Sequence, residues 1–243
     1  MNAVGEDISL ETTHHVTPAM QDYLKAVYRT RDEAGTATVQ RLAVELGVSS
    51  PSVTNMVKRL AELGLLEHTL YQGVALTGAG ERVAVEVTRH HRLLEQFLVE
   101  TLGYSWDEVH VEAERLEHHI SEAMEARIDA ALGFPTHDPH GDPIPRHDGT
   151  VPGGGEVRLL DLPPGTTATV GRVPDRDAGL LRHIADLGLR PGCRVKMVEV
   201  RPFEGPVRLR VDEREVVIGR PLAGVIHVRP DDADHEEVLA SPP

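Results

Sequence analysis

The sequence predicts a mainly helical protein that ends in a small β domain, because its composition changes twice along the chain. Up to about residue 133, apolar side chains recur with helical spacing and prolines are few. Residues 134–155 are dense in Pro, Gly and Asp, which cannot continue a helix and indicate a linker. Residues 156–230 contain short Val, Leu and Ile runs broken by PPG, RPG and EGP turns, which is typical of β-strands.

Bulk properties exclude several classes of protein. The 243 residues are enough for two or three compact units. A single cysteine, Cys193, excludes an internal disulfide and a cysteine-based zinc site. The sequence lacks an apolar run of about 18 residues, and its start is not a basic stretch followed by an apolar one. We therefore expect a cytoplasmic protein with no signal peptide and no membrane partner.

The charge is acidic as a whole but locally basic. A net charge of −14 opposes casual binding to nucleic acid. Residues 49–61, however, carry two cations and no acid. An acidic protein with one basic helix can still bind DNA, particularly if bound cations offset carboxylates elsewhere. The end of the chain, DDADHEEVLASPP, is predicted to be an acidic tail.

The first helix is expected to begin near Pro18, which follows Thr17 and is favoured in a first helical turn. Asp22 and Lys25 lie off its apolar stripe, so the helix alone predicts that both face solvent. The stripe consists of four residues, Met20, Leu24, Val27 and Tyr28.

Two further helices are predicted around a tight turn at Gly47. Residues 38–46 form an amphipathic helix, and Ser49 and Ser50 then precede Pro51, which indicates a capped start for the next one. Its apolar side consists of Val53, Met56, Val57 and Leu60.

A helix, a short turn and a second helix match the helix-turn-helix arrangement, whose second helix enters the major groove of double-stranded DNA. Short polar groups there suit base edges, and Lys58 and Arg59 suit phosphates. Residues 67–81 are expected to add a two-stranded wing that turns at Gly73. An ordinary helical hairpin is the alternative. The candidate DNA-binding residues are Ser49, Ser50, Pro51, Ser52, Thr54, Asn55, Lys58 and Arg59.

A metal site is indicated on a helix predicted to include residues 109–124. With about 100° per residue, Val109, Ala113, Leu116, Ile120 and Met124 form one apolar stripe. Beside it fall four potential ligands, His110, Glu114, Glu117 and His118. His119 falls on the opposite flank.

A preceding helix carries His91 and Glu95 one turn apart, beside an apolar run. Two such polar stripes could build an internal cluster whose carboxylates a divalent cation would neutralise. Salt-bridged helix surfaces are the alternative. Imidazole and carboxylate ligands without a thiolate suit Mn(II), Fe(II) or Co(II), although affinity order favours other divalent metals such as Zn(II).

Together these motifs resemble the diphtheria-toxin-repressor/manganese-transport-regulator family of metal-dependent transcriptional repressors. The similar segments are TPAMQDYLKAVY, LAVELGVSSPSVTNMVKRL, RHHRLLEQFL, VEAERLEHHIS and GDPIP. The C-terminal part resembles the SH3-like domain of ferrous-iron transport accessory proteins in two segments, LPPGTTATVGRV and LLRHIADLGLRPGCRV. The resemblance implies a winged helix-turn-helix domain, a helical metal-binding and dimerisation domain, and a C-terminal SH3-like β-barrel. The expected boundaries are 1–16 for a disordered N-terminus, 17–82, 83–140, 141–155 for the linker, 156–230, and 231–243 for the tail.

The resemblance also implies two metal sites. The primary site would consist of Asp22, Glu114, Glu117 and His118, and the ancillary site of His91, Glu95 and His110. Iron-responsive members have Met and Cys at the positions of Asp22 and Glu114, whereas manganese-responsive members have acids there, so Mn(II) is the expected cofactor. Lys25 stands where small manganese regulators have a Glu, which argues against their closely spaced metal pair. Three-domain members send two ligands from the SH3-like domain. Asp177 aligns with one of them, whereas the position of the other is occupied by Leu180, which cannot bind a metal.

The implied mechanism is that of a homodimer whose two recognition helices bind a palindromic operator when metal joins Asp22 to the helical domain. Two alternatives stay open. A metallohydrolase could use the same ligands, although the HExxH order is absent and no general base stands out. A metal-independent winged-helix regulator could respond to an organic ligand; the main hypothesis expects no organic substrate.

Overall fold

The computed structural model describes residues 16–32, 34–69 and 73–231. The chain divides into two compact units, Met1–Arg89 and His90–Pro243. The expected disordered N-terminus and acidic tail fall almost entirely outside the described residues. Across the described ranges, no helix combines the length and the apolar character that crossing a bilayer requires.

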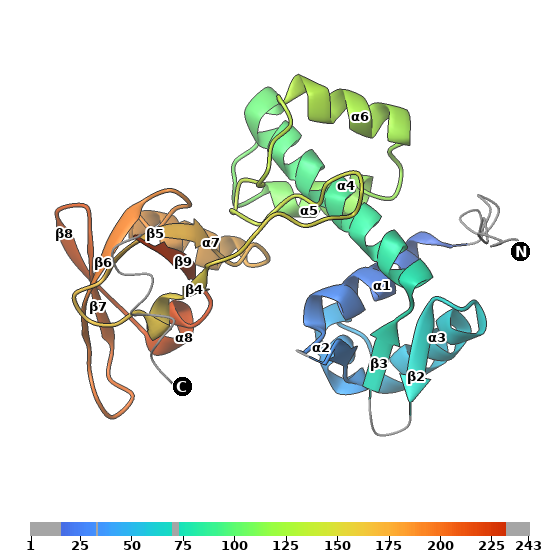
Figure 1. The fold of residues 1–243 in the computed structure, drawn as a ribbon, viewed down its shortest axis with the longest axis horizontal. Helices are drawn as coiled ribbons and strands as arrows, with labels where there is room; N and C mark the ends of the chain where they lie inside the picture. Colours follow the sequence, from blue (N-terminus) through green and yellow to red (C-terminus); the bar gives the residue numbers. More distant parts are fainter. Residues whose placement is uncertain (1–15, 33, 70–72, 232–243) are drawn as a thin grey trace, which may run out of the picture. The chain divides into compact units, whose positions relative to one another are not determined.

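Three helices form the core of the first unit: α1 (Pro18–Thr30), α2 (Val39–Leu46) and α3 (Ser50–Glu62) (Figure 1). Thr17 caps α1 by accepting a hydrogen bond from the backbone N–H of Met20, which confirms the predicted start. Gly47 ends α2 with a φ of 63°, in the left-handed conformation that glycine adopts without strain. One detail was wrong: Lys25 is buried rather than solvent-facing, with 4% of its surface exposed.

The predicted wing is present as the antiparallel strands β2 (Leu66–Thr69) and β3 (Gly73–Leu76). Their connection, residues 70–72, lies outside the described part of the chain. Gly73 is therefore the first residue of β3, paired with Thr69, and not the turn itself. A short strand that the sequence did not predict, β1 (Thr36–Ala37), pairs with β3 and gives the sheet order β1-β3-β2.

The second unit begins within the long helix α4 (Gly78–Leu102) and continues with α5 (Val109–Leu116) and α6 (Glu122–Ala131). The expectation of one helix through residues 109–124 was wrong, because the chain turns between α5 and α6. Ser121 caps α6 by accepting from the backbone N–H of Met124. The break also turns Met124 out of the expected apolar stripe, and 47% of its surface is exposed.

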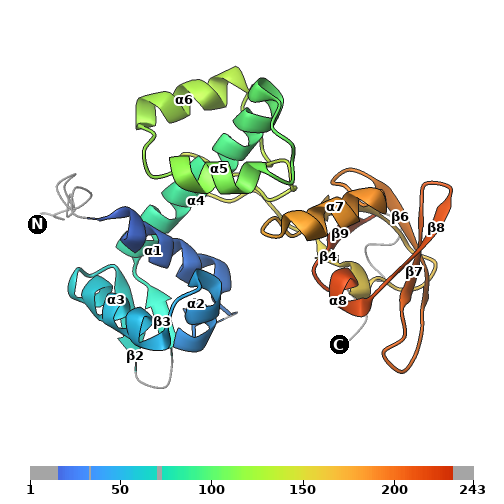
Figure 2. The same cartoon turned by 180° about the vertical axis from the view of Figure 1, so that it is seen from behind.

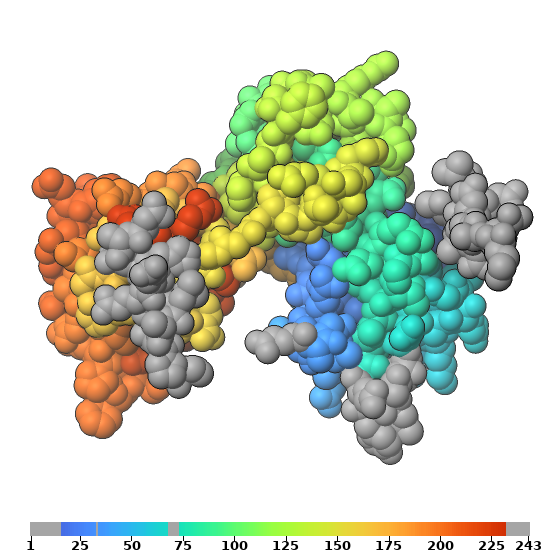
Figure 3. Space-filling view, in the orientation of Figure 1, coloured from blue at the N-terminus to red at the C-terminus, as the bar shows by residue number. Residues whose placement is uncertain are grey.

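The Pro- and Gly-rich segment after α6 is more than a linker. His140 and Ile144 are buried. Figure 3 shows this Pro- and Gly-rich segment lying across the helices of the second unit. Asp138 Oδ1 accepts hydrogen bonds from the backbone N–H groups of His140 and Asp142, which folds the segment into a tight turn. Gly141 is required there, since a Cβ on it would lie 1.9 Å from a backbone oxygen and its φ is 89°.

The C-terminal part of the second unit is a six-stranded antiparallel sheet with the order β4-β9-β5-β6-β7-β8. The strands are β4 (Val157–Arg158), β5 (Thr167–Arg172), β6 (Arg194–Val200), β7 (Val207–Val211), β8 (Arg214–Ile218) and β9 (His227–Pro230). Within the described residues β4 and β8 are not paired with each other. The sheet is thus SH3-like, as expected, although the barrel is not closed between β4 and β8.

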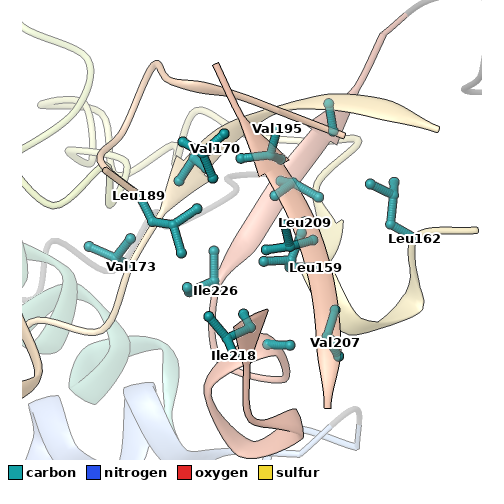
Figure 4. Packing of buried hydrophobic residues seen from close by; sticks show 14 of the residues in the cluster. Leu159, Leu162, Val170, Val173, Leu189, Val195, Val207, Leu209, Ile218 and Ile226 are labelled. Atoms are coloured by element: carbon teal, nitrogen blue, oxygen red, sulfur yellow. The ribbon is translucent and has the colours of Figure 1, made fainter. Parts of the chain in front are cut away.

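The sheet encloses its own apolar core, which Figure 4 shows in close view. Helix α7 (Ala178–Asp186) covers the sheet (Figure 2) and contributes Leu181 and Ile184 to this core. Two smaller elements complete it, η2 (Leu159–Asp161) and α8 (Arg220–Ala223). The sheet domain also contacts the helical part of its unit, where Arg190 lies over the Trp106 ring at 4.7 Å and Arg182 pairs with Asp107.

Candidate metal centre and nucleic-acid interface

The first unit exposes a polar face along α3. Val53, Val57 and Leu60 are buried, which confirms most of the predicted apolar side and turns the opposite side outward. Ser49 caps the helix by accepting from the Ser52 backbone N–H, and Thr54 donates to the Ser50 carbonyl oxygen. The other candidate DNA-binding residues, Pro51, Asn55, Lys58 and Arg59, are exposed.

This exposed face has the chemistry of a DNA-reading helix. Its N-terminal half presents hydroxyl and amide groups, which can donate to and accept from base edges. Lys58 and Arg59 follow on the same helix and suit phosphate oxygens. Structure and sequence agree on the helix and its exposed side; the contact of each residue with DNA stays a prediction.

In the second unit, three nitrogen and oxygen atoms converge within a buried cluster. His91 Nε2 lies 3.0 Å from Glu95 Oε1, His110 Nδ1 lies 3.1 Å from the same oxygen, and the two ring nitrogens are 3.1 Å apart. His91 and Glu95 lie one turn apart on α4, and His110 lies in the first turn of α5. The structure thus brings together all three residues of the predicted ancillary site.

This triangle has the dimensions of a metal site. Ligands about 2.1 Å from an octahedral cation lie about 3.0 Å from one another. Glu95 is completely buried, and an isolated buried carboxylate would be costly. Burial acts to raise the pKa of the Glu95 carboxyl, but the charge of His91 and hydrogen bonds from the surrounding imidazoles hold it well below its usual range. The carboxylate therefore remains ionised and able to bind a cation.

His91 connects this triangle with the predicted primary ligands of the same unit. Its other ring nitrogen, Nδ1, lies 2.6 Å from Glu117 Oε2 and 3.9 Å from Glu114 Oε1. Glu117 is fully buried, and its Oε1 is 3.4 Å from His118 Nε2. Three of the four predicted primary ligands therefore lie together at the end of α5 and the turn that follows. An imidazole whose far nitrogen meets a carboxylate is a common support in metal sites.

The fourth predicted primary ligand, Asp22, lies on α1 in the other compact unit and is partly buried. Its role as a ligand stays a prediction from the resemblance.

The C-terminal domain presents Asp175, rather than Asp177, to the ancillary cluster. Asp175 Oδ2 lies 3.7 Å from His110 Nδ1, and Asp175 joins His91, Glu95 and His110 in a group whose ligand atoms lie within 4.8 Å of one another. The Asp177 carboxylate instead caps α7 by accepting from the Leu180 backbone N–H at 3.0 Å. The structure thus brings Asp175, two residues before the predicted Asp177, to the cluster, and the identity of the ligand from this loop stays a prediction.

Sequence reasoning also missed two buried groups beside Glu95. The Nδ1 atom of His140 lies 3.5 Å from Glu95 Oε2, and its Nε2 atom lies 2.6 Å from the carbonyl oxygen of Trp106. The His140 ring also stacks on the Trp106 ring. Asp138 forms a buried group with Glu95 and His140. An acid and a histidine within the Pro-rich segment were the available signal, but the composition indicated a linker.

A further missed residue, His90, fastens the turn that carries Glu117. Its Nδ1 lies 3.1 Å from the Glu117 carbonyl oxygen and its Nε2 lies 3.1 Å from Glu125 Oε2. Both partners are acceptors unless Glu125 is protonated, so this arrangement favours a charged imidazole and a buried ion pair between α4 and α6. The pair links the break between α5 and α6 to the long helix.

Comparison with known protein families matches the chain in three parts. The family "Iron dependent repressor, N-terminal DNA binding domain" matches residues 15–74, and "Iron dependent repressor, metal binding and dimerisation domain" matches residues 77–146. The "FeoA domain" matches residues 157–230.

Similar individual proteins include repressors named for two metals. The iron-dependent repressor IdeR of Mycobacterium tuberculosis is 34% identical over 218 residues, which cover 85% of this chain and 94% of that protein. The transcriptional regulator MntR of Escherichia coli O157:H7 is 40% identical over 108 residues, covering 44% of this chain and 69% of that protein. A solved structure described as a manganese-dependent transcriptional repressor in complex with manganese is 41% identical, with a TM-score of 0.82, and the match covers 87% of this chain and all of that one. The chain therefore belongs to the diphtheria-toxin-repressor/manganese-transport-regulator family of metal-dependent transcriptional repressors, which bind operator DNA and dimerise.

Proposed function

We propose that this protein is a cytoplasmic repressor that responds to Mn(II) and controls genes of metal homeostasis. The observation that carries the proposal is the ligand set, which contains carboxylate and imidazole groups and neither a thiolate nor a thioether. Such oxygen-rich sites suit Mn(II) better than sites with sulfur ligands do. The manganese-bound relative of similar fold supports the same choice, whereas the iron-dependent relative makes Fe(II) the alternative within the family.

The proposed primary site combines Asp22 of α1 with Glu114, Glu117 and His118 of the second unit. A bound divalent cation supplies positive charge that offsets these carboxylates and favours their approach. Asp22, as the ligand from the DNA-binding unit, transmits occupancy to α3 by limiting the positions that this unit adopts. His91, Glu95, His110 and Asp175 form the proposed ancillary site, and His91 connects the two through its contact with Glu117.

The proposed DNA complex is a homodimer on a palindromic operator. Two copies of α3 would read two half-sites, as in other dimeric helix-turn-helix proteins. The helices after Gly103 are the proposed interface. Val111 and Met124 support this role, because 56% and 47% of these apolar residues are exposed in the single chain.

Operator binding titrated with Mn(II), Fe(II), Co(II) and Zn(II) tests the proposal. We expect wild type to bind operator DNA tightly with Mn(II) and weakly without metal. Asp22→Met should shift the response from Mn(II) towards Fe(II), since it replaces an oxygen ligand with a thioether. DNA affinity that is independent of metal in every case would contradict the proposal.

A matched pair of neighbouring histidines sharpens the assignment. His118→Ala should abolish the metal response, because His118 Nε2 faces Glu117. His119→Ala should leave it unchanged, because His119 is exposed. Equal effects of the two substitutions would remove His118 from the site.

We propose further that the ligand set binds metal without catalysing a reaction. The sequence lacks the HExxH order, in which a glutamate between two zinc ligands serves as the general base for a bound water. Turnover of esters, peptides or phosphodiesters by the purified, metal-loaded protein would refute this.

A further inference from the structure

The turn between α5 and α6 is not explained by its own residues. Residues 117–120, EHHI, lack the glycine, asparagine or proline that commonly ends a helix. The chain nevertheless leaves α5 at Glu117, which is the C-cap of that helix, and begins α6 after Ser121, which is the N-cap of the next one. A contact from another part of the chain is therefore needed to hold the end of α5 in place.

His90 of α4 supplies this contact. In an uninterrupted helix the Glu117 carbonyl oxygen would accept a hydrogen bond from the backbone N–H four residues later, that of Ser121. Here it lies 3.1 Å from His90 Nδ1. A carbonyl oxygen can only accept, so Nδ1 is the donor. The buried His90 imidazole thus takes the place of a helical hydrogen bond at the point where α5 ends.

The other side of the same ring contacts α6. His90 Nε2 lies 3.1 Å from Glu125 Oε2, and the Glu125 side chain is buried. Glu122 Oε1 is 3.8 Å from the same nitrogen, but 63% of the Glu122 side chain is exposed. One imidazole therefore joins α4, the turn and α6, and both of its close contacts are with buried or backbone groups.

The turn that His90 holds carries two of the proposed primary ligands. The Glu117 carboxylate lies 2.6 Å from His91 Nδ1 through Oε2 and 3.4 Å from His118 Nε2 through Oε1. Glu117 is thus held at its carbonyl by His90 and at its carboxylate by His91. Successive residues of a helix point about 100° apart, so the two histidines approach Glu117 from different directions. Ligands that are ordered in advance lose less conformational entropy when the metal binds.

We propose that His90 is a positioning residue of the primary metal site. Its Nδ1–H fixes the backbone of Glu117, and with it the places at which the Glu117 carboxylate and the His118 imidazole meet the ion. His90 itself binds no metal in this arrangement. The inference rests on the proposed function, because it adds a supporting residue to the proposed primary site.

Two substitutions of His90 separate the two contacts of its ring. The amide nitrogen of an asparagine occupies the place of Nδ1, and that of a glutamine occupies the place of Nε2. His90→Asn therefore keeps the donor to the Glu117 carbonyl, whereas His90→Gln keeps only the donor towards Glu125. Glu122→Gln is the control, because it changes the exposed carboxylate beside the same ring. Full-length, metal-free proteins are titrated with Mn(II) by calorimetry, and thermal denaturation without metal gives the stability of each.

We expect His90→Gln to weaken Mn(II) binding at the primary site by about 10- to 100-fold, the usual effect of losing a group that orients a metal ligand. His90→Asn and Glu122→Gln should keep the wild-type affinity, although His90→Asn should be less stable because its contact with Glu125 is lost. A merely structural role would instead lower the affinity in step with stability. Equal affinities in the two His90 variants, whether lowered or unchanged, would overturn the inference, and so would a loss confined to His90→Asn.

Failure of this inference is distinguishable from failure of the proposed function. His118→Ala removes a proposed primary ligand and identifies the binding step that belongs to the primary site, and His110→Gln does the same for the ancillary site. If His118→Ala leaves every binding step unchanged, the proposed primary site falls. If His118→Ala removes a step that His90→Gln does not weaken, the primary site stands and the positioning role of His90 falls.

Discussion

Removing the two cations of α3 should make DNA binding markedly less sensitive to salt. Lys58 and Arg59 are exposed on this helix, and residues 49–61 contain no acid to offset them. If both contact phosphates, each releases counterions from the DNA on binding. The double variant Lys58→Ala/Arg59→Ala therefore loses a term that depends steeply on salt concentration, and the buried side of α3 is not altered.

The magnitude follows from the number of charges. A dimer loses four cations in the double variant, and the slope of log K against log salt is about −0.9 for each phosphate neutralised. The slope should become shallower by about 3.6. Between 50 and 200 mM salt, a fourfold change, the variant should lose roughly 150-fold less affinity than wild type does.

Fluorescence anisotropy with a labelled operator, measured at saturating Mn(II) over this salt range, gives both slopes. Lys196→Ala/Arg210→Ala is the matched control, because it also removes one lysine and one arginine but from exposed, neighbouring positions on β6 and β7. The control should keep the wild-type slope. If the α3 variant keeps it too, these residues do not contact phosphates and the assignment of α3 is wrong.

Three other predictions concern stability and the metal cluster. Gly80→Ala should lower the free energy of unfolding by more than about 2 kcal/mol, because the added Cβ would lie 2.0 Å from a backbone oxygen. In the control Gly78→Ala, the added Cβ meets only a side-chain tip at 3.9 Å. Thermal denaturation should show this control to be neutral or stabilising. Asp177→Ala should lower the free energy of unfolding by about 1 kcal/mol, because a helix cap is lost, and should leave metal affinity unchanged. Asp175→Ala should weaken metal binding measured by calorimetry. The reverse pattern of metal affinities would identify Asp177 as the ligand. Burial, followed by the charge of a nearby arginine, lowers the pKa of His227, so folding favours the neutral ring. The stability that this residue contributes is therefore present above pH 6.5 and is lost as the pH falls through the depressed pKa. His227→Gln should flatten that part of the profile of stability against pH.

The helices and their exposed faces could be predicted from sequence because their signals are local. The proline at the start of α1, the glycine after α2 and the spacing of apolar residues each act within a few positions. The His91 and Glu95 pair was found for the same reason, since a one-turn spacing places both on one face of α4.

The missing parts of the site depend on contacts between distant segments. The acid and the histidine of the Pro-rich segment do not show by themselves that this segment folds back and buries His140 against α4. The break after Glu117 was missed because the helical period continues through residues at which the chain turns. Asp175 was missed because the loop before α7 lacks a periodic pattern that would fix the alignment on which Asp177 was named.

Trp106 gives the molecule a built-in optical reporter. It is the one tryptophan in the sequence, and its carbonyl oxygen accepts from His140. Its ring stacks with the His140 imidazole and also contacts the guanidinium of Arg190. A charged neighbour on an indole ring changes the energy and yield of its emission, so one fluorescence signal senses both the metal cluster and the contact of the sheet domain. Rapid mixing with Mn(II) would thus give the rates of filling and of domain contact from an unlabelled protein.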